Sequence, residues 1–356
     1  MTLPSDKKLD TRVLSQIYDN TVATYKYYWF VSLLDIFVKT QRRKISFWEI
    51  IVGMIAEAWY PIHYFHLSFG KSDSLYEQII ELQKVLNIPI DTNKEELKNL
   101  LISKINDNKI KSFLRVFTWN VPYWFLSPWI VSKDKKEIVR CSQNFKNTCI
   151  YAINGDDIEI NPLWENYLID NYNILRDFSF WNLTIFLQKR NPNVPDVPSK
   201  LIKPIQRESL NSQRKFWNIY IDINGSINCI YTGKSLYKKD YDLDHFVPWS
   251  FVSHNLLWNL LPVNSSINSS KGNNLPPLDI FLRPFAQTHQ KAIQTIYPMN
   301  QNNKLFEDYL SIYNSVSELA NLSEDDFLRI FQKTFSPIVQ IAENMGFKYW
   351  QNAMTP

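Results

Sequence analysis

Four prolines divide the sequence into two parts of different character. They lie at positions 192, 195, 198 and 204, among asparagine and lysine residues. Proline fixes its backbone φ angle and has no amide hydrogen, so neither a helix nor a central strand can run through such a segment. We therefore expect residues 189–204 to be an extended, fairly stiff linker. The chain has 356 residues, about twice the length of a typical domain, which agrees with two folded parts.

The part before the linker has the apolar spacing of helices. Ser46, followed three residues later by Glu49, is typical of a capped helix start, and Pro61 should end or kink that helix. Residues 74–86 and 93–105 place their apolar side chains at helical spacing, with one polar face. This part of the chain is therefore predicted to be mainly helical.

A short hairpin and a helix are predicted at the end of this part. Ile150–Ile153 and Ile158–Ile160 are β-rich runs on either side of an Asn-Gly-Asp-Asp sequence, which is typical of a turn. Asn161 is then suited to cap a helix that has Pro162 in its first turn and continues through Leu187.

A β-rich island follows the linker. Residues 217–223 and 226–231 are β-rich runs joined by Asn224 and Gly225, a pair that is a strong hairpin signal. A third short run covers residues 241–246. We expect the chemistry of the protein in this island, because the surrounding sequence is helical.

Helical spacing returns after the island, with Ser323 as the predicted N-cap of a helix at 324–335. We expect a mainly helical domain over residues 1–200, a small module over residues 205–275, and a helical segment over residues 276–356 that packs on the rest. The predicted fold class is therefore mainly α with a small α+β island.

Cysteine usage and the pattern of apolar residues indicate the cellular compartment of the protein. The three cysteines, at 141, 149 and 229, include no CxxC pair, which excludes a disulfide framework and a four-cysteine zinc site. The first ten residues lack the apolar stretch of a secretion signal, so we expect a cytoplasmic protein. The apolar stretches 27–38 and 47–69 contain charged residues, and we interpret them as buried helices rather than membrane spans.

Positive charge is concentrated in one segment. The formal net charge is only +4, but residues 101–149 carry nine basic and three acidic side chains. The basic residues considered are Lys104, Lys109, Lys111, Arg115, Lys133, Lys135, Lys136 and Arg140, and the aromatic residues between them are Phe113, Phe117, Trp119, Tyr123, Trp124, Phe125 and Trp129. Such interleaving suits a nucleic-acid surface. The alternative is an aromatic core with solvated charges; we favour the core for the aromatic residues and nucleic acid for the charges.

Four polar residues in and after the island have a distinctive spacing. Asp244 and His245 are adjacent, Asn259 follows 14 residues later within WNLLP, and Asn268 lies 9 residues further within NSSKGN. A neutral imidazole accepts a proton near pH 7, so His245 is a candidate general base. One carboxylate and one amide oxygen suit Mg²⁺, which prefers few protein oxygens together with water and phosphate.

These motifs, with the Tyr-Thr-Gly turn at 231–233, resemble the HNH endonuclease family over about residues 217–274. The pattern is the HNN form, which the HNH domains of CRISPR effector nucleases also have. The resemblance implies a ββα-metal nuclease module that hydrolyses DNA with one Mg²⁺ or Mn²⁺. It also implies Asp244 and Asn268 as the metal ligands, and a catalytic set that includes Asn259, whose amide holds the His245 segment in place.

Two lysines are candidate substrate contacts. Lys271, near the end of the short metal-binding helix that the family implies, is suited to contact phosphate, and Lys234 could contact the nucleic-acid backbone or be a solvated loop charge. Many HNH proteins contain a zinc ion held by two CxxC pairs. Here Cys229 has no such partner, and Asn264 and Ile267 stand where the second pair would be, so we expect no structural zinc.

The predicted function is a metal-dependent HNH endonuclease that cuts DNA, most simply duplex DNA, in phage defence or restriction. Residues 1–200 would then serve recognition, regulation or assembly with a protein partner or a second copy, with no membrane contact. One alternative is a nucleic-acid-binding or scaffold protein with a catalytically silent HNH core. Another is an HNH nuclease that cleaves RNA.

Overall fold

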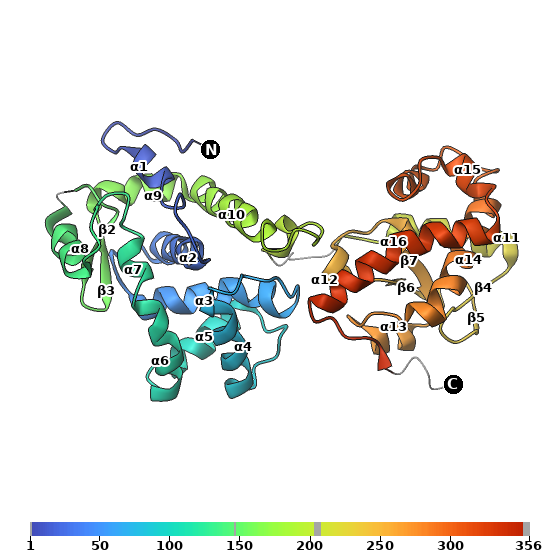
Figure 1. Cartoon of the computed structure of the whole chain (residues 1–356), viewed down its shortest axis with the longest axis horizontal. Helices are drawn as coiled ribbons and strands as arrows, with labels where there is room; N and C mark the ends of the chain where they lie inside the picture. The colour runs from blue at the N-terminus through green and yellow to red at the C-terminus, as the bar shows by residue number, and fades with distance from the viewer. Residues whose placement is uncertain (1, 146, 203–207, 352–356) are drawn as a thin grey trace. The chain divides into compact units, whose positions relative to one another are not determined.

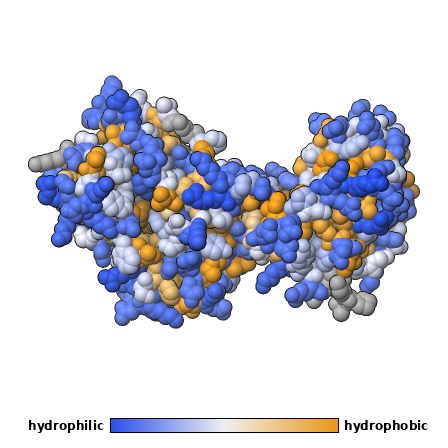
Figure 2. All heavy atoms as spheres, in the orientation of Figure 1, coloured by the Kyte–Doolittle hydropathy of each residue, from blue (hydrophilic) through white to orange (hydrophobic). Residues whose placement is uncertain are grey.

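The computed structural model describes residues 2–145, 147–202 and 208–351 (Figure 1). The chain divides into two compact units. The first contains the residues up to Pro192 and a short segment that begins at Val197, and the second contains Asn193–Asp196 and the C-terminal part. The division falls within residues 189–204, but the prediction that this segment is extended is wrong for its described part, which consists of turns and a 3₁₀ helix at Pro198–Lys200 with Val197 and Lys200 buried. Residues 203 and 204 lie outside the described residues. Figure 2 shows polar residues over most of the visible face of each unit, with apolar residues scattered among them.

Two long helices pack together at the centre of the first unit. They are α2 (Tyr25–Thr40) and α3 (Phe47–His63), and most residues of both are buried. The predicted capped start of α3 is confirmed, because Ser46 Oγ accepts a hydrogen bond from the Trp48 amide and Glu49 accepts one from the Ser46 amide. Pro61 lies in the last turn, and the helix ends two residues later.

Further helices complete the helical part of the first unit. The predicted helices at 74–86 and 93–105 are confirmed as α4 (Ser74–Leu86) and α5 (Lys94–Lys104). The helix predicted from Asn161 through Leu187 is instead divided at Asn171, whose ψ of 16° is not helical. The remaining helices are α1 (Thr11–Ser15), α6 (Asn108–Leu114), α7 (Val121–Trp124), α8 (Lys135–Ser142), α9 (Glu165–Asp170) and α10 (Tyr172–Gln188), with 3₁₀ helices at Arg115–Thr118, Gln143–Phe145, Pro162–Trp164 and Pro198–Lys200.

A small antiparallel sheet completes the first unit. The predicted hairpin is confirmed as β2 (Tyr151–Asn154) and β3 (Asp157–Ile160). A third strand, β1 (Lys44–Ser46), pairs with β3, which gives the order β1-β3-β2. The sequence did not indicate β1, because three residues are too few to show an alternating pattern.

The second unit begins with a correction. Residues predicted as a strand at 217–223 belong to helix α11 (Asn211–Asn224). Phe216, Trp217, Tyr220 and Ile221 are all buried at helical spacing, so the run packs as one helical stripe. The pair after it is not a hairpin turn, since Gly225, at a φ of 81°, ends the helix.

Four short strands follow α11 in two pairs. β4 (Ile227–Asn228) pairs with β5 (Ser235–Leu236), and β6 (Asp242–His245) pairs antiparallel with β7 (Leu260–Val263). The predicted run at 241–246 is therefore confirmed as a strand. Strand β7 was not predicted, and its Pro262 makes the sequence atypical of one. Between and after them lie α12 (Trp249–Val252), a 3₁₀ helix at Leu257–Asn259 and α13 (Ser265–Lys271).

The C-terminal helices share one core with these strands. They are α14 (Leu278–Ile296), α15 (Val316–Ala320) and α16 (Glu324–Asn344), with a 3₁₀ helix at Lys304–Ser311; α16 begins at the predicted Ser323 cap and extends beyond the predicted end. The ring of Phe246 stacks on Phe285 at 4.0 Å between centroids. The predicted class, mainly α with a small α+β island, is confirmed. Within the described residues, no helix is both long and apolar enough to cross a bilayer.

Candidate active site

Asp244 lies in β6 with both carboxylate oxygens engaged. Its Oδ1 accepts a hydrogen bond from Lys271 Nζ at 3.0 Å, and its Oδ2 accepts one from the Tyr231 hydroxyl at 3.0 Å. Asp244 is 3% exposed and Lys271 is completely buried. Burial raises the pKa of Asp244 above its ordinary value, while the Lys271 ammonium and the Tyr231 hydroxyl oppose that rise.

Lys271 connects α13 to the end of β6. Besides its ion pair with Asp244, its Nζ donates to the backbone carbonyl oxygen of His245 at 2.7 Å. The predicted contact between Lys271 and phosphate stays a prediction. The ammonium has three hydrogens and two of these are used, so one remains for phosphate, but the side chain is fully buried and such a contact requires Nζ to become accessible.

His245 follows Asp244 in β6, and its side chain points to the other side of the strand. It is partly exposed, and its Nε2 lies 3.0 Å from Oδ1 of Asn255, whose own Nδ2 donates to Glu208 at 3.4 Å. An amide oxygen only accepts hydrogen bonds, so this contact puts the proton of the neutral ring on Nε2 and its basic lone pair on Nδ1. Asn255 was not identified from the sequence, because nothing in its local pattern distinguishes it from other loop asparagines.

Asn259 holds the backbone that follows His245. Its Oδ1 accepts from the amide of Val247 and its Nδ2 donates to the carbonyl oxygen of the same residue, both at 2.9 Å. The carbonyl oxygen of Asn259 also accepts from the Phe246 amide at 2.8 Å. The side chain is completely buried, so its amide fixes the exit of β6 rather than facing a substrate.

Asn268 lies in the middle of α13 and faces β6. Its Nδ2 is 3.5 Å from Oδ2 of Asp242, the residue two positions before Asp244. Residues two apart share one face of a strand, so Asp242, Asp244 and Asn268 belong to the same side of the site. The alternation of side chains along β6 places Asp242 on the same face as Asp244. This signal could have identified Asp242 as a site residue only if the bounds of the strand were known.

The turn between β4 and β5 contributes Tyr231 to the site. The amide of Cys229 donates to the carbonyl oxygen of Lys234 at 2.9 Å, which closes the turn, and the Cys229 side chain is buried. The side chain of Lys234 is exposed at the tip. Asn264, where many family members have a zinc-binding cysteine, instead caps α13 by accepting from the Ser266 amide at 3.0 Å.

The donor types at the site fit a hard divalent cation. Asp242, Asp244 and Asn268 offer carboxylate and amide oxygens, and each carboxylate oxygen has a second lone pair beyond its present hydrogen bond. Among the described residues, no three or more histidine, cysteine, aspartate or glutamate side chains are grouped to hold a metal ion. A cation here would therefore depend on few protein oxygens, completed by water and phosphate, which is typical of Mg²⁺.

Comparison with known proteins agrees with this geometry. Residues 229–277, which contain Tyr231 and the four predicted catalytic residues, match the family model described as HNH endonuclease. The chain is also 29% identical over 158 residues to the CRISPR-associated endonuclease Cas9 of Listeria innocua serovar 6a, a match that covers 43% of this chain and 11% of that protein. The chain thus matches only about a tenth of the length of this relative. No solved structure matches the chain significantly. Residues 229–277 are an HNH endonuclease domain, as the sequence motifs predicted.

Proposed function

We propose that the chain is a metal-dependent endonuclease that hydrolyses phosphodiester bonds in DNA, with His245 as the general base. The observation that carries the proposal is the contact between His245 Nε2 and Asn255 Oδ1, in a domain that matches HNH endonucleases. This contact directs the basic lone pair of the ring to Nδ1, the atom that would accept a proton from water.

The reaction can be written with this chain's own groups. Nδ1 of His245 takes a proton from a water molecule, the water oxygen attacks phosphorus in line, and the bond from phosphorus to the 3′ oxygen breaks. The departing 3′ oxygen takes a proton from solvent water, so the products are a 5′-phosphate and a 3′-hydroxyl. Mg²⁺ or Mn²⁺, held by Asp244 and Asn268, would supply positive charge to the scissile phosphate and the departing oxygen.

The other site residues keep these groups in position. Asn259 fixes Val247 and thereby the end of β6, so the imidazole keeps one orientation. Lys271 neutralises Asp244 inside the folded domain. Lys234, exposed at its turn, and Lys271, through the third hydrogen of its ammonium once this group is accessible, are the proposed contacts with the nucleic-acid backbone.

Duplex DNA is the proposed substrate, and phage defence or restriction in the cytoplasm is the proposed setting. The printed name of the Listeria relative, a CRISPR-associated endonuclease, favours a defence role. The buried contact between Lys271 and Asp244 favours a second candidate, a nucleic-acid-binding protein with a silent HNH core, because an internal cation already pairs with the proposed metal ligand.

Digestion of labelled substrates separates these possibilities. Purified protein is incubated with duplex DNA, single-stranded DNA and RNA, each with Mg²⁺, Mn²⁺ or EDTA. The proposal predicts metal-dependent cleavage of DNA with 5′-phosphate ends. Preferential cleavage of RNA would establish the RNA alternative, and binding without cleavage under both metals would establish the silent core.

A further inference from the structure

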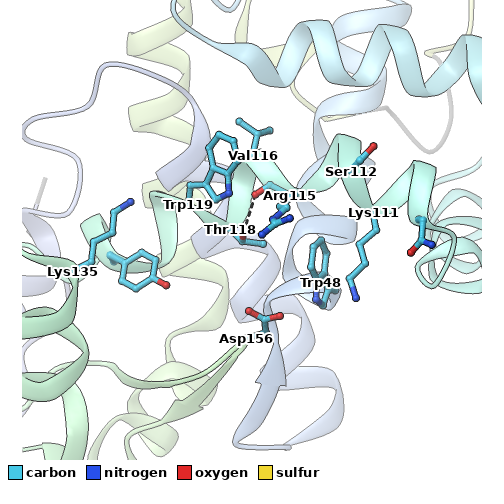
Figure 3. A pocket seen from close by; sticks show the side chains of 11 residues that line it. Trp48, Lys111, Ser112, Arg115, Val116, Thr118, Trp119, Lys135 and Asp156 are labelled. Carbon is cyan, nitrogen blue, oxygen red and sulfur yellow. Dashed lines mark hydrogen bonds between the residues drawn. The ribbon is translucent and has the colours of Figure 1, made fainter.

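The first unit contains a hollow of about 580 Å³ whose walls are both basic and aromatic (Figure 3). Its principal lining residues come from the start of α3, from α6 and the 3₁₀ helix after it, from α7 and from the start of α8. They are Trp48, Lys111, Arg115, Trp119, Tyr123 and Lys135, and we call this set the basic pocket. A nucleobase with its sugar and phosphate is small enough to enter a hollow of this volume.

Three cations line the basic pocket. Lys111 and Arg115 are four residues apart along consecutive helical turns, so their side chains lie on one face. Lys135 adds a third charge from α8. Within the described parts of the chain, none of the three forms an ion pair, and the pocket contains one carboxylate, that of Asp156. The excess of positive charge favours an anionic ligand.

Flat aromatic rings lie beside these charges. Lys111 Nζ is 5.1 Å from the ring centre of Trp48, and Lys135 Nζ is 5.5 Å from that of Tyr123. Trp119 is 54% exposed, although most of the neighbouring aromatic residues of this segment are at least partly buried. An exposed indole next to lysine and arginine offers a base a stacking surface and its phosphate a counter-charge.

A second hollow lies next to the basic pocket, with Val116 in the wall of both. It has a volume of about 590 Å³ and is lined by Tyr25, Phe117 and Trp124 among others. Together the two hollows have more volume than one nucleotide occupies. They therefore fit consecutive nucleotides of a strand better than a free nucleotide.

We propose that the basic pocket and the adjoining hollow bind single-stranded nucleic acid, with phosphates at Lys111, Arg115 and Lys135 and an unpaired base on Trp119. Stacking requires exposed base faces, so a duplex should bind more weakly than a single strand. The site lies in the first unit and uses no residue of the HNH domain. It does not depend on cleavage by that domain.

The test measures binding by fluorescence anisotropy, using a labelled 12-nucleotide single strand. The full chain carries His245→Ala and the buffer contains EDTA, so cleavage cannot interfere. In this background, Lys111→Ala/Arg115→Ala/Lys135→Ala should weaken binding at least tenfold and reduce the slope of log affinity against log salt by about 2, as three lost phosphate contacts predict. The matched control removes the same charge from exposed residues of the same segment, as Lys104→Ala/Lys133→Ala/Lys136→Ala.

Stacking is tested by a second matched pair. Trp119→Ala should weaken binding roughly fivefold to a hundredfold. Trp181→Ala removes an indole of similar exposure, 52%, from α10 outside the pocket and should leave affinity unchanged. If the triple variant does not fold, crosslinking of the otherwise unaltered chain to a strand containing 5-iodouracil gives an independent result. The crosslinks should map to Trp48, Trp119 or Tyr123.

Several results would overturn the proposal. Equal losses in the matched variants would show that the effect is general electrostatics. Displacement of the strand by polyglutamate or by duplex at equal charge concentration would show no preference for unpaired bases. Displacement by a mononucleotide at the same nucleotide concentration would indicate a free-nucleotide site, and crosslinks confined to the second unit would place binding elsewhere. If the unaltered chain cleaves no substrate but these binding results are as predicted, only the proposed cleavage is contradicted.

Discussion

Lys271 and Asp244 form a buried ion pair in which one ammonium group also binds the backbone of the proposed general base. The Nζ atom is 3.0 Å from the Asp244 carboxylate and 2.7 Å from the carbonyl oxygen of His245. Removing one member of a buried pair leaves the other charge without compensation. The pair thus links the stability of the domain to the position of strand β6.

We expect Lys271→Met to lower the free energy of unfolding by about 3–5 kcal/mol, because Asp244 then remains charged or takes up a proton inside the domain. The Asp244→Asn/Lys271→Met double variant should recover part of that loss. Urea unfolding of both single variants and the double variant gives the coupling energy. Arg329→Met, which breaks an exposed pair with Asp326, is the control and should change stability far less. Additive losses would contradict the coupling.

Stability should fall in acid partly through His289. This residue is completely buried, its Nδ1 lies 2.7 Å from the Tyr309 hydroxyl, and burial lowers its pKa to about 3. The unfolded chain has the ordinary value of 6.5, so it binds more protons than the folded chain between these values. The contribution is complete above pH 6.5 and is lost at up to about 1.4 kcal/mol per pH unit as pH falls toward 3.

Calorimetry of the full chain between pH 7 and pH 4 checks whether stability falls with falling pH as predicted. His289→Gln, which has no charge in this range, should show a smaller fall of the unfolding temperature with acidity than the unaltered chain. His63, in the first unit, also has a lowered pKa, of about 4. The unfolding transition of the first unit should therefore keep its pH dependence in the His289 variant. Parallel pH curves for the two proteins would contradict the assignment.

Asn255 should set the pH profile of cleavage. Asn255→Asp places a carboxylate beside the His245 ring, which favours the imidazolium, so the acid limb of kcat/KM should move to higher pH. Asn255→Leu should lower the rate without that shift, because the ring loses only its orienting hydrogen bond. Initial cleavage rates from pH 5 to pH 9 distinguish the two. An acid limb that stays in place in the aspartate variant would show that His245 is not the titrating base.

Asn259 should affect both stability and rate through Val247. Asn259→Ala leaves a buried amide and a buried carbonyl group without partners, at a cost of about 2 kcal/mol or more. It should also lower kcat more than it weakens DNA binding, because the end of β6 is no longer fixed. Asn264→Ala, which removes only the cap of α13, should have a smaller effect on both. Unchanged kcat in a folded Asn259→Ala protein would contradict this positioning role.

Much of the local structure could be predicted from the sequence, because its signals are local. The capping box at Ser46, the hairpin around Gly155 and the cap at Ser323 depend on residues a few positions apart. The hairpin predicted at Asn224-Gly225 was wrong, because the same pair suits both a two-residue turn and the end of a helix. Only the packing of α11 on the core selects between these structures.

The site motif was recognisable, but its contacts were not. Tyr231, Asn255 and Lys271 meet Asp244 and His245 across 13, 10 and 27 residues of sequence. The pairing of β6 with β7 and the position of α13 set these distances. Spacing along the chain identifies residue types suited to the chemistry, whereas the ion pair of Asp244 depends on how three elements pack.

The most direct measurement of the central claim is cleavage of supercoiled plasmid by the purified chain with Mg²⁺ or Mn²⁺. The account predicts nicking or linearisation that His245→Ala reduces by about 10²–10⁴-fold, the usual contribution of a general base. His254→Ala, which removes another imidazole of the domain, from the loop after α12, should cleave at the unaltered rate. Undiminished cleavage by His245→Ala, or none by the unaltered chain with either metal, would contradict the account.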